Sequence, residues 1–276
     1  MELTKEILED IIKQFAEEGK IFSNEAQFQF ELAWALREYK DKKGNKLFGD
    51  DNDKVKLEHL SIENKMYTDI VVRVDNKYYP IELKYKTADK QIKYKKGDLT
   101  KITYLQGAHD DASYDYLKDV ERLEKIVINK QFTPFDGESN FSIEKGFAII
   151  ISNEPKIWGE GVRNITKSPR RDYYLFSSEN AQYCPYRTIE KNSKLGWVDK
   201  NTGDWFNSDG TMQIEKQKNE RFNAITLGHE YKLEWKDYMN SENPFSPLSP
   251  SGYEEVREGN ARKGHPFKYM IVVVTK

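Results

Sequence analysis

Two segments near the N-terminus carry apolar residues at the spacing of a helix. In residues 3–18 the apolar side chains recur three or four positions apart, and Gly19 ends the pattern. A second helix is predicted to begin at Asn24, with Gln27 three residues later in the position of a capping box, and to continue to about Tyr39. The first elements of the chain are therefore expected to be two consecutive helices.

The next apolar segments are shorter and rich in β-branched and aromatic residues, which is typical of strands. Three strands are predicted, over residues 55–62, 66–74 and 77–86. A Lys-rich connector then leads to a long helix over roughly 101–128, and the continuous apolar run at 146–153 predicts a strand buried on both faces. The segments AITLGHEYKLEW and PFKYMIVVVTK indicate further strands near the C-terminus.

The order of these elements is ααβββαβ, which indicates an α/β fold in which helices flank a mixed sheet and C-terminal strands extend it. The sequence contains no internal repeat and no linker long enough to require a domain boundary. Residues 1–276 are therefore expected to form one domain, with a core over about 20–155 and a C-terminal β extension over about 156–276.

Composition narrows the classes of function. At 37% hydrophobic and 33% charged residues, the chain is expected to be soluble with a sizeable core. Its net charge of −2 provides no global basic field, so a nucleic-acid partner would need a local basic patch. The N-terminus resembles no signal peptide, the apolar runs are too short to span a bilayer, and the single Cys184 fits a reducing compartment. A cytoplasmic protein without a membrane partner is expected.

Two carboxylates and a lysine interrupt the apolar pattern of the second and third predicted strands: Asp69, Glu82 and Lys84. The dipeptide Asp75-Asn76 between these strands predicts a two-residue turn. Such a turn places Asp69 directly opposite Glu82, with Cβ atoms roughly 4.5–5.5 Å apart. Because Lys84 follows two residues after Glu82, it shares the same face of the sheet.

Directly opposed carboxylates repel one another unless a cation lies between them. Mg²⁺ favours one or two carboxylates together with waters and phosphate oxygens, and a lysine could position the attacking water or stabilise charge on the phosphate. Glu31 favours such a metal-phosphate site, because a carboxylate in the middle of an apolar helix needs a partner. The alternatives stay open: solvent-facing charges on an ordinary hairpin, and a Glu31 at the edge of its helix or paired with an arginine.

Glu31 on a helix, Asp69 on a strand and Glu82-Leu83-Lys84 on the next strand resemble the core pattern of the PD-(D/E)xK nuclease superfamily, which has the restriction-endonuclease-like fold. Thr68 stands where the name of that pattern has proline. Other segments, including GFAIIISNEPKIWGE and ITLGHEYKLEWKDY, are similar to a widespread set of uncharacterised bacterial proteins that carry the same IELKYK segment.

The resemblance implies a metal-dependent nuclease that hydrolyses phosphodiester bonds by a metal-activated water, with DNA favoured over RNA. It implies that Asp69, Glu82 and the Leu83 carbonyl bind Mg²⁺ or, in its place, Mn²⁺, that Glu31 assists, and that Lys84 acts on the water or the phosphate. The alternative is a nuclease-fold nucleic-acid-binding subunit of a larger defence or repair complex, without activity of its own. A homodimer and a separate partner subunit both stay open.

The connector after Lys84 is rich in lysine, with tyrosines between the lysines. Lys86, Lys93 and Lys95 would form a strip that binds the nucleic-acid backbone, and the alternative is a solvated loop. Gln106 lies near the predicted start of the long helix, where related nucleases often place a polar residue close to the active site. Further along that helix, the spacing of Asp119 and Arg122 indicates an ion pair that supports the helix itself.

Overall fold

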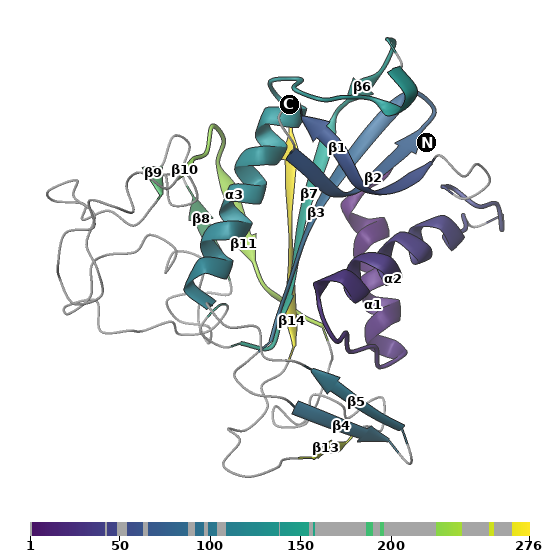
Figure 1. Ribbon diagram of the computed structural model, residues 1–276, viewed down its shortest axis with the longest axis vertical. Coiled ribbons are helices and arrows are strands. Elements are labelled where there is room, and N and C mark those ends of the chain that lie inside the picture. The colour runs from purple at the N-terminus through teal and green to yellow at the C-terminus, as the bar shows by residue number, and fades with distance from the viewer. Residues whose placement is uncertain are drawn as a thin grey trace, which may run out of the picture.

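A seven-stranded mixed sheet forms the centre of the part of the protein that the structure describes (Figure 1). The structure is a computed structural model and describes residues 2–41, 43–48, 54–62, 66–87, 92–96, 99–103, 109–137, 139–154, 157, 186–189, 194–195, 225–238, 254–256 and 267–276. The main strands are β1 (Val55–Ile62), β2 (Met66–Val74), β3 (Lys77–Lys86), β7 (Lys145–Ser152), β14 (Lys268–Thr275) and β12 (Lys236–Asp237), in that spatial order. The short β6 (Ser142–Ile143) also pairs with β3.

Helices cover both faces of this sheet. Figure 1 shows α1 (Lys5–Glu17) and α2 (Glu25–Glu38) on one side of the central strands and α3 (His109–Val127) on the other. The predicted start of the second helix is confirmed, because the Asn24 side chain accepts a hydrogen bond from the Gln27 N–H at 2.8 Å. The predicted α/β class, with a mixed sheet between helices, is therefore confirmed. None of the described helices has the length and apolar character needed to cross a membrane.

The β2–β3 hairpin has the predicted register. Asp75 and Asn76 form the turn, Asp75 has the positive φ of 55° that such a turn requires, and Val74 pairs with Lys77. The regular antiparallel pairing runs as far as Ile70 opposite Ile81, one residue before Asp69 and Glu82. On its other side β3 pairs in parallel with β7, so it is the strand at which the sheet changes from antiparallel to parallel pairing.

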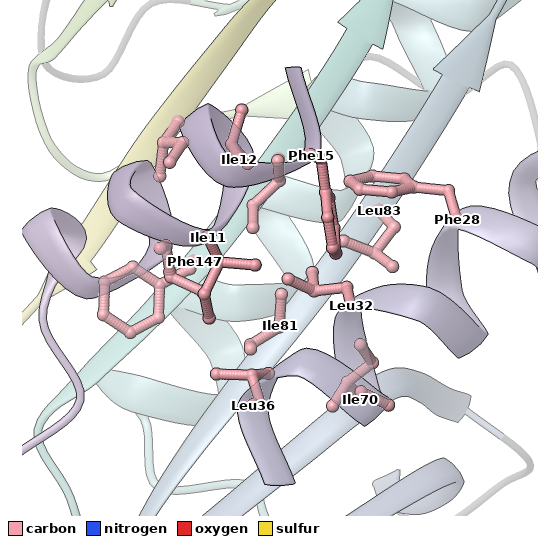
Figure 2. Close-up of a cluster of buried hydrophobic side chains, with 14 of the residues drawn as sticks. Ile11, Ile12, Phe15, Phe28, Leu32, Leu36, Ile70, Ile81, Leu83 and Phe147 are labelled. Atoms are coloured by element: carbon pink, nitrogen blue, oxygen red, sulfur yellow. The ribbon is translucent and has the colours of Figure 1, made fainter. Parts of the chain in front are cut away.

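Two apolar clusters hold the helices against the sheet. The cluster under α1 and α2 contains the residues in Figure 2, with Ile11, Ile12, Phe15, Phe28, Leu32 and Leu36 from the helices and Ile70, Ile81, Leu83 and Phe147 from the strands. Successive β2 residues alternate between the clusters, since Ile70 and Val72 belong to this one and Val71 to the one under α3. Burial on both faces explains the continuous apolar runs in the sequence.

Helix α3 packs closely on β7. A Cβ at Gly146 would lie 3.0 Å from Leu123 Cδ2 and 3.1 Å from Val127 Cγ2, so only glycine allows this approach without a shift. The Tyr116 hydroxyl adds a 2.9 Å hydrogen bond to the Ala148 carbonyl. These contacts fix α3 over the centre of the sheet, beside β3.

Three expectations about the elements are corrected. The Lys-rich connector contains β4 (Ile92–Lys96) and β5 (Leu99–Thr103), which form a separate sheet with β13 (Glu254–Val256), and the long helix begins only at His109. The β-branched residues of 99–103 favour a strand over the predicted helix start.

In the C-terminal part, β14 and β12 extend the central sheet as expected. Two further strands pair elsewhere, β10 (Ile225–Thr226) with β9 (Lys194–Leu195) and β11 (Tyr231–Glu234) with β8 (Tyr186–Ile189).

Helix α2 is less buried than its apolar sequence indicates. Phe30 and Trp34 are 59% and 56% exposed, whereas Phe28 and Leu32 are fully buried. The physical reason is that α2 packs on the sheet with one side only, so its other side faces away even though its residues are apolar. The helix packs on the sheet, but only one side of its apolar surface is buried there.

The packing of α2 leads to a stability prediction. Leu32→Ala is expected to lower the free energy of unfolding by about 2–5 kcal/mol, because it leaves a cavity between α2 and the sheet. Leu57→Ala, at a strand position that is 41% exposed, is the matched control and should cost less than about 1 kcal/mol. Urea unfolding followed by circular dichroism measures both, and equal losses would contradict the packing described here.

Candidate active site

The predicted site residues of β2 and β3 lie in a group of charged side chains on the face of the sheet that α3 covers. We call this group the charge cluster, and it consists of Glu25, Asp69, Glu82, Lys84, Asp119 and Arg122. Asp69 comes from β2, Glu82 and Lys84 from β3, Asp119 and Arg122 from α3, and Glu25 from the first turn of α2. Three of these residues were predicted as site residues, and the fold brings those three together.

Asp69 is held at both its side chain and its main chain. Its Oδ2 accepts a 2.6 Å hydrogen bond from the Leu83 N–H, just where the regular pairing of β2 and β3 has ended. Its carbonyl oxygen accepts from Gln29 Nε2 at 2.7 Å, and the same nitrogen donates to Glu58 at 2.7 Å. A carboxylate fixed in this way is oriented before any ligand arrives.

Lys84 is surrounded by carboxylates. Its Nζ lies 3.0 Å from Asp119 Oδ2 and 3.7 Å from Glu25 Oε1, and it donates to the Leu83 carbonyl at 3.2 Å. Burial alone would lower the pKa of Lys84, but Asp119, Glu25 and Asp69 outweigh it and raise the pKa above its ordinary value. Lys84 is therefore a permanent cation, which can stabilise negative charge but has no lone pair to accept a proton.

Glu82 is the most deeply buried carboxylate of the charge cluster, with 1% of its side chain exposed. Its Oε1 accepts a 2.9 Å hydrogen bond from Arg122 Nη1, while Arg122 Nη2 donates to Asp119 Oδ1 at 2.9 Å. Burial raises the pKa of Glu82 well above its ordinary value, against the opposing effect of Arg122. Burial also raises the pKa of Asp69, to about 7, although Lys84 and the Leu83 N–H act in the other direction.

The charges of the cluster do not balance. When all groups are ionised, the carboxylates of Glu25, Asp69, Glu82 and Asp119 outnumber the cations of Lys84 and Arg122 by two. Burial is the main cause of the raised pKa values of Asp69 and Glu82, and the neighbouring carboxylates add to it, so protonation is one way to remove the excess. A bound divalent cation would remove it equally well.

The donors available to such a cation are oxygens, as Mg²⁺ prefers. Asp69 and Glu82 could each supply a carboxylate, and Leu83, which follows Glu82 and donates its N–H to Asp69, could supply its carbonyl, which now accepts from Lys84. Among the described residues, no three His, Cys, Asp or Glu side chains converge as a ready-made metal site. A site of two carboxylates, one carbonyl and waters does not require three, so the residues present fit Mg²⁺.

Glu31 pairs with a residue outside the charge cluster. Its carboxylate accepts a 2.9 Å hydrogen bond from Lys20 Nζ and is 29% exposed, so a local cation already provides the partner that burial was expected to demand. The α2 carboxylate that reaches Lys84 is Glu25, whose Oε2 also accepts from the Tyr85 N–H at 2.9 Å. Acidic residues are common in the first turn of a helix, so the sequence did not indicate that Glu25 belongs to the site.

The structure describes only some of the predicted nucleic-acid-binding residues. Lys86 is the last residue of β3, paired with Ser152 of β7. Lys93 and Lys95 belong to β4, where only the backbone is described, and Gln106 lies outside the described residues. The strip that these residues were predicted to form stays a prediction.

Sequence reasoning missed the part that α3 plays. Asp119 and Arg122 do form the predicted ion pair within the helix, but the same side chains also contact Lys84 and Glu82 of β3. Their spacing could have indicated a face directed at the sheet, since Asp119 is buried and Arg122 half-buried, close in sequence to the buried apolar Tyr116 and Val120. Comparison of the chain with protein-family models, curated proteins and solved structures found no match.

The raised pKa of Asp69 gives a pH prediction for the metal-free protein. Because the folded-state pKa is about 7 and the unfolded value is about 4, the folded state binds more protons between these limits. The free energy of unfolding of the wild type, relative to Asp69→Asn, should therefore be highest below about pH 4 and fall until about pH 7. Urea unfolding in EDTA across this range measures it.

The control is Asp41→Asn. Hydrogen bonds from the backbone N–H groups of Asn45 and Lys43 lower the pKa of Asp41, so its contribution is lost only as the pH falls through the acid range. The wild type and this control should show the same slope between about pH 4 and 7. If Asp69→Asn also runs parallel to the wild type, Asp69 does not titrate as described.

Proposed function

We propose that this protein is a metal-dependent nuclease with a restriction-endonuclease-like core, which hydrolyses phosphodiester bonds. The observation that carries the proposal is a pair of carboxylates on adjacent strands, the half-buried Asp69 and the buried Glu82, beside a lysine that stays protonated. The element order and the Glu82-Leu83-Lys84 segment support it, because they match the pattern of the PD-(D/E)xK superfamily. DNA is proposed before RNA by the same resemblance.

In this proposal Asp69, Glu82 and the Leu83 carbonyl hold Mg²⁺ or Mn²⁺. When bound, the cation would lower the pKa of a coordinated water and neutralise charge on the phosphate. Lys84 then contributes its positive charge to the phosphate oxygens, where negative charge develops. Glu25 and Asp119 orient Lys84, since their carboxylates flank its Nζ. The raised pKa of Lys84 argues against a role for it as general base.

A second candidate has one observation in its favour. Arg122 and Lys84 already pair with the buried carboxylates, so the charge cluster could act as a structural network in a nucleic-acid-binding subunit that needs no metal. Such a subunit would belong to a larger defence or repair complex. The excess of carboxylates over cations favours the nuclease, because a purely structural network gains nothing from unbalanced buried charge.

Turnover distinguishes the two candidates. The purified chain is incubated with supercoiled DNA, linear duplex, single-stranded DNA and RNA, each with Mg²⁺, with Mn²⁺ and with EDTA. Lys84→Ala and Asp69→Asn are expected to reduce metal-dependent cleavage by about 100-fold or more, because each removes a group that acts on the transition state or on the cation. Lys77→Ala is the matched control, since Lys77 lies on the same strand but pairs with Glu2.

The pattern of loss decides the result. Cleavage that requires metal, survives Lys77→Ala and disappears in both site variants supports the nuclease. Cleavage that persists in the site variants indicates a contaminating enzyme and contradicts the assignment of the site. Calorimetry with Mn²⁺ separates an active site that lacks its substrate from a cluster that binds no metal at all.

A further inference from the structure

Arg122 is a residue of the charge cluster that joins three of its four secondary-structure elements. Its Nη1 donates to Glu82 Oε1 at 2.9 Å and to the Tyr67 carbonyl at 3.2 Å, and its Nη2 donates to Asp119 Oδ1 at 2.9 Å. The guanidinium therefore links β3, β2 and α3. Its partner on β3 is also the carboxylate that would bind the divalent cation in the proposed function.

The two partners of the Arg122–Glu82 pair differ in their freedom to move. The Glu82 side chain is 1% exposed and sits on a central strand, whereas the Arg122 side chain is 26% exposed on a helix. A long arginine side chain at a partly exposed position can turn toward water, while a fully buried glutamate on a paired strand cannot. Any rearrangement at Glu82 must therefore come from Arg122.

A guanidinium and a divalent cation on one carboxylate oppose each other. Like charges that share one carboxylate repel strongly in a buried site, and Arg122 already holds Oε1 of Glu82. Asp119 offers Arg122 a second carboxylate three residues away on its own helix, so the guanidinium has a partner even when it leaves Glu82.

We infer that Arg122 is a positioning residue that competes with the divalent cation for Glu82. It neutralises Glu82 in the metal-free protein and moves away from Glu82 when the cation binds. The inference rests on the proposed function, and it adds a control on metal loading to that function. Arg122 keeps the metal-free cluster folded, and in return it lowers the affinity of the site for metal.

The test is a calorimetric titration with Mn²⁺ at neutral pH, on the wild type, Arg122→Gln and Arg122→Lys. Arg122→Gln removes the competing charge, and we expect its Kd for Mn²⁺ to be at least about tenfold lower than that of the wild type, since a hydrogen bond between charged groups is worth about that factor. Arg122→Lys keeps the charge but cannot contact Glu82 and Asp119 through one planar fork, so its Kd should lie between the two.

Two controls locate the binding. Lys125→Gln removes a cation from the same helix that pairs with Glu121 away from the cluster, and it should leave the Kd unchanged. Glu82→Gln in the wild-type and Arg122→Gln backgrounds should abolish binding in both. Binding that survives Glu82→Gln is not at this site and overturns the inference.

Thermal unfolding gives a readout that does not depend on activity. In EDTA, Arg122→Gln should have a lower Tm than the wild type, because Glu82 is left buried without its nearest cation. Saturating Mn²⁺ should then raise the Tm of Arg122→Gln by more than that of the wild type, because the tighter site gains more from binding. If the Gln variant does not fold in EDTA, the same comparison is made with Arg122→Lys.

The outcomes separate this inference from the proposed function. Mn²⁺ binding at Glu82 that is unchanged or weaker in Arg122→Gln would show that Arg122 does not compete, and it would overturn the inference while leaving the nuclease proposal intact. Absence of Mn²⁺ binding in the wild type and in all variants would overturn both.

Discussion

Glu82 brings a carboxylate into the interior of the sheet, where water does not reach it. A buried, unpaired carboxylate costs several kcal/mol or takes up a proton, so the surrounding elements must supply positive charge and hydrogen-bond donors. Helix α3 does so with Arg122, and β3 itself does so with Lys84. The position of α3 over β3 is thus an electrostatic requirement as well as a matter of apolar packing.

The strand pairing of the sheet becomes irregular at the charge cluster. The antiparallel pairing of β2 and β3 stops at Ile70 and Ile81, and the Asp69 carboxylate takes the next strand N–H, that of Leu83. On its other edge β3 continues in parallel pairing with β7. Because β3 is paired on one edge and no longer regularly paired on the other, it can present carboxylates and a carbonyl to a ligand while it stays in the core.

The charge cluster also restricts the chemistry. Carboxylates hold Lys84 protonated, so it can act on a phosphate as a cation but cannot remove a proton from water. When all groups are ionised, the cluster has two more carboxylates than cations, and burial together with these carboxylates raises the pKa values of Asp69 and Glu82. Both features suit a site completed by a divalent cation, and the excess of negative charge would be unfavourable in a network whose only role was structural.

The sequence by itself determined the hairpin and hence the shared face of Asp69, Glu82 and Lys84, because a two-residue turn and the two-residue period of a strand are local properties. It also determined the bounds of β1, β2 and β3 and the Asn24 cap. Only the tertiary structure decided that Glu25 and not Glu31 reaches Lys84, and that Asp119 and Arg122 face the sheet. Those contacts depend on how the helices dock across the sheet, and docking follows from the packing of residues distant in sequence, which no local pattern encodes.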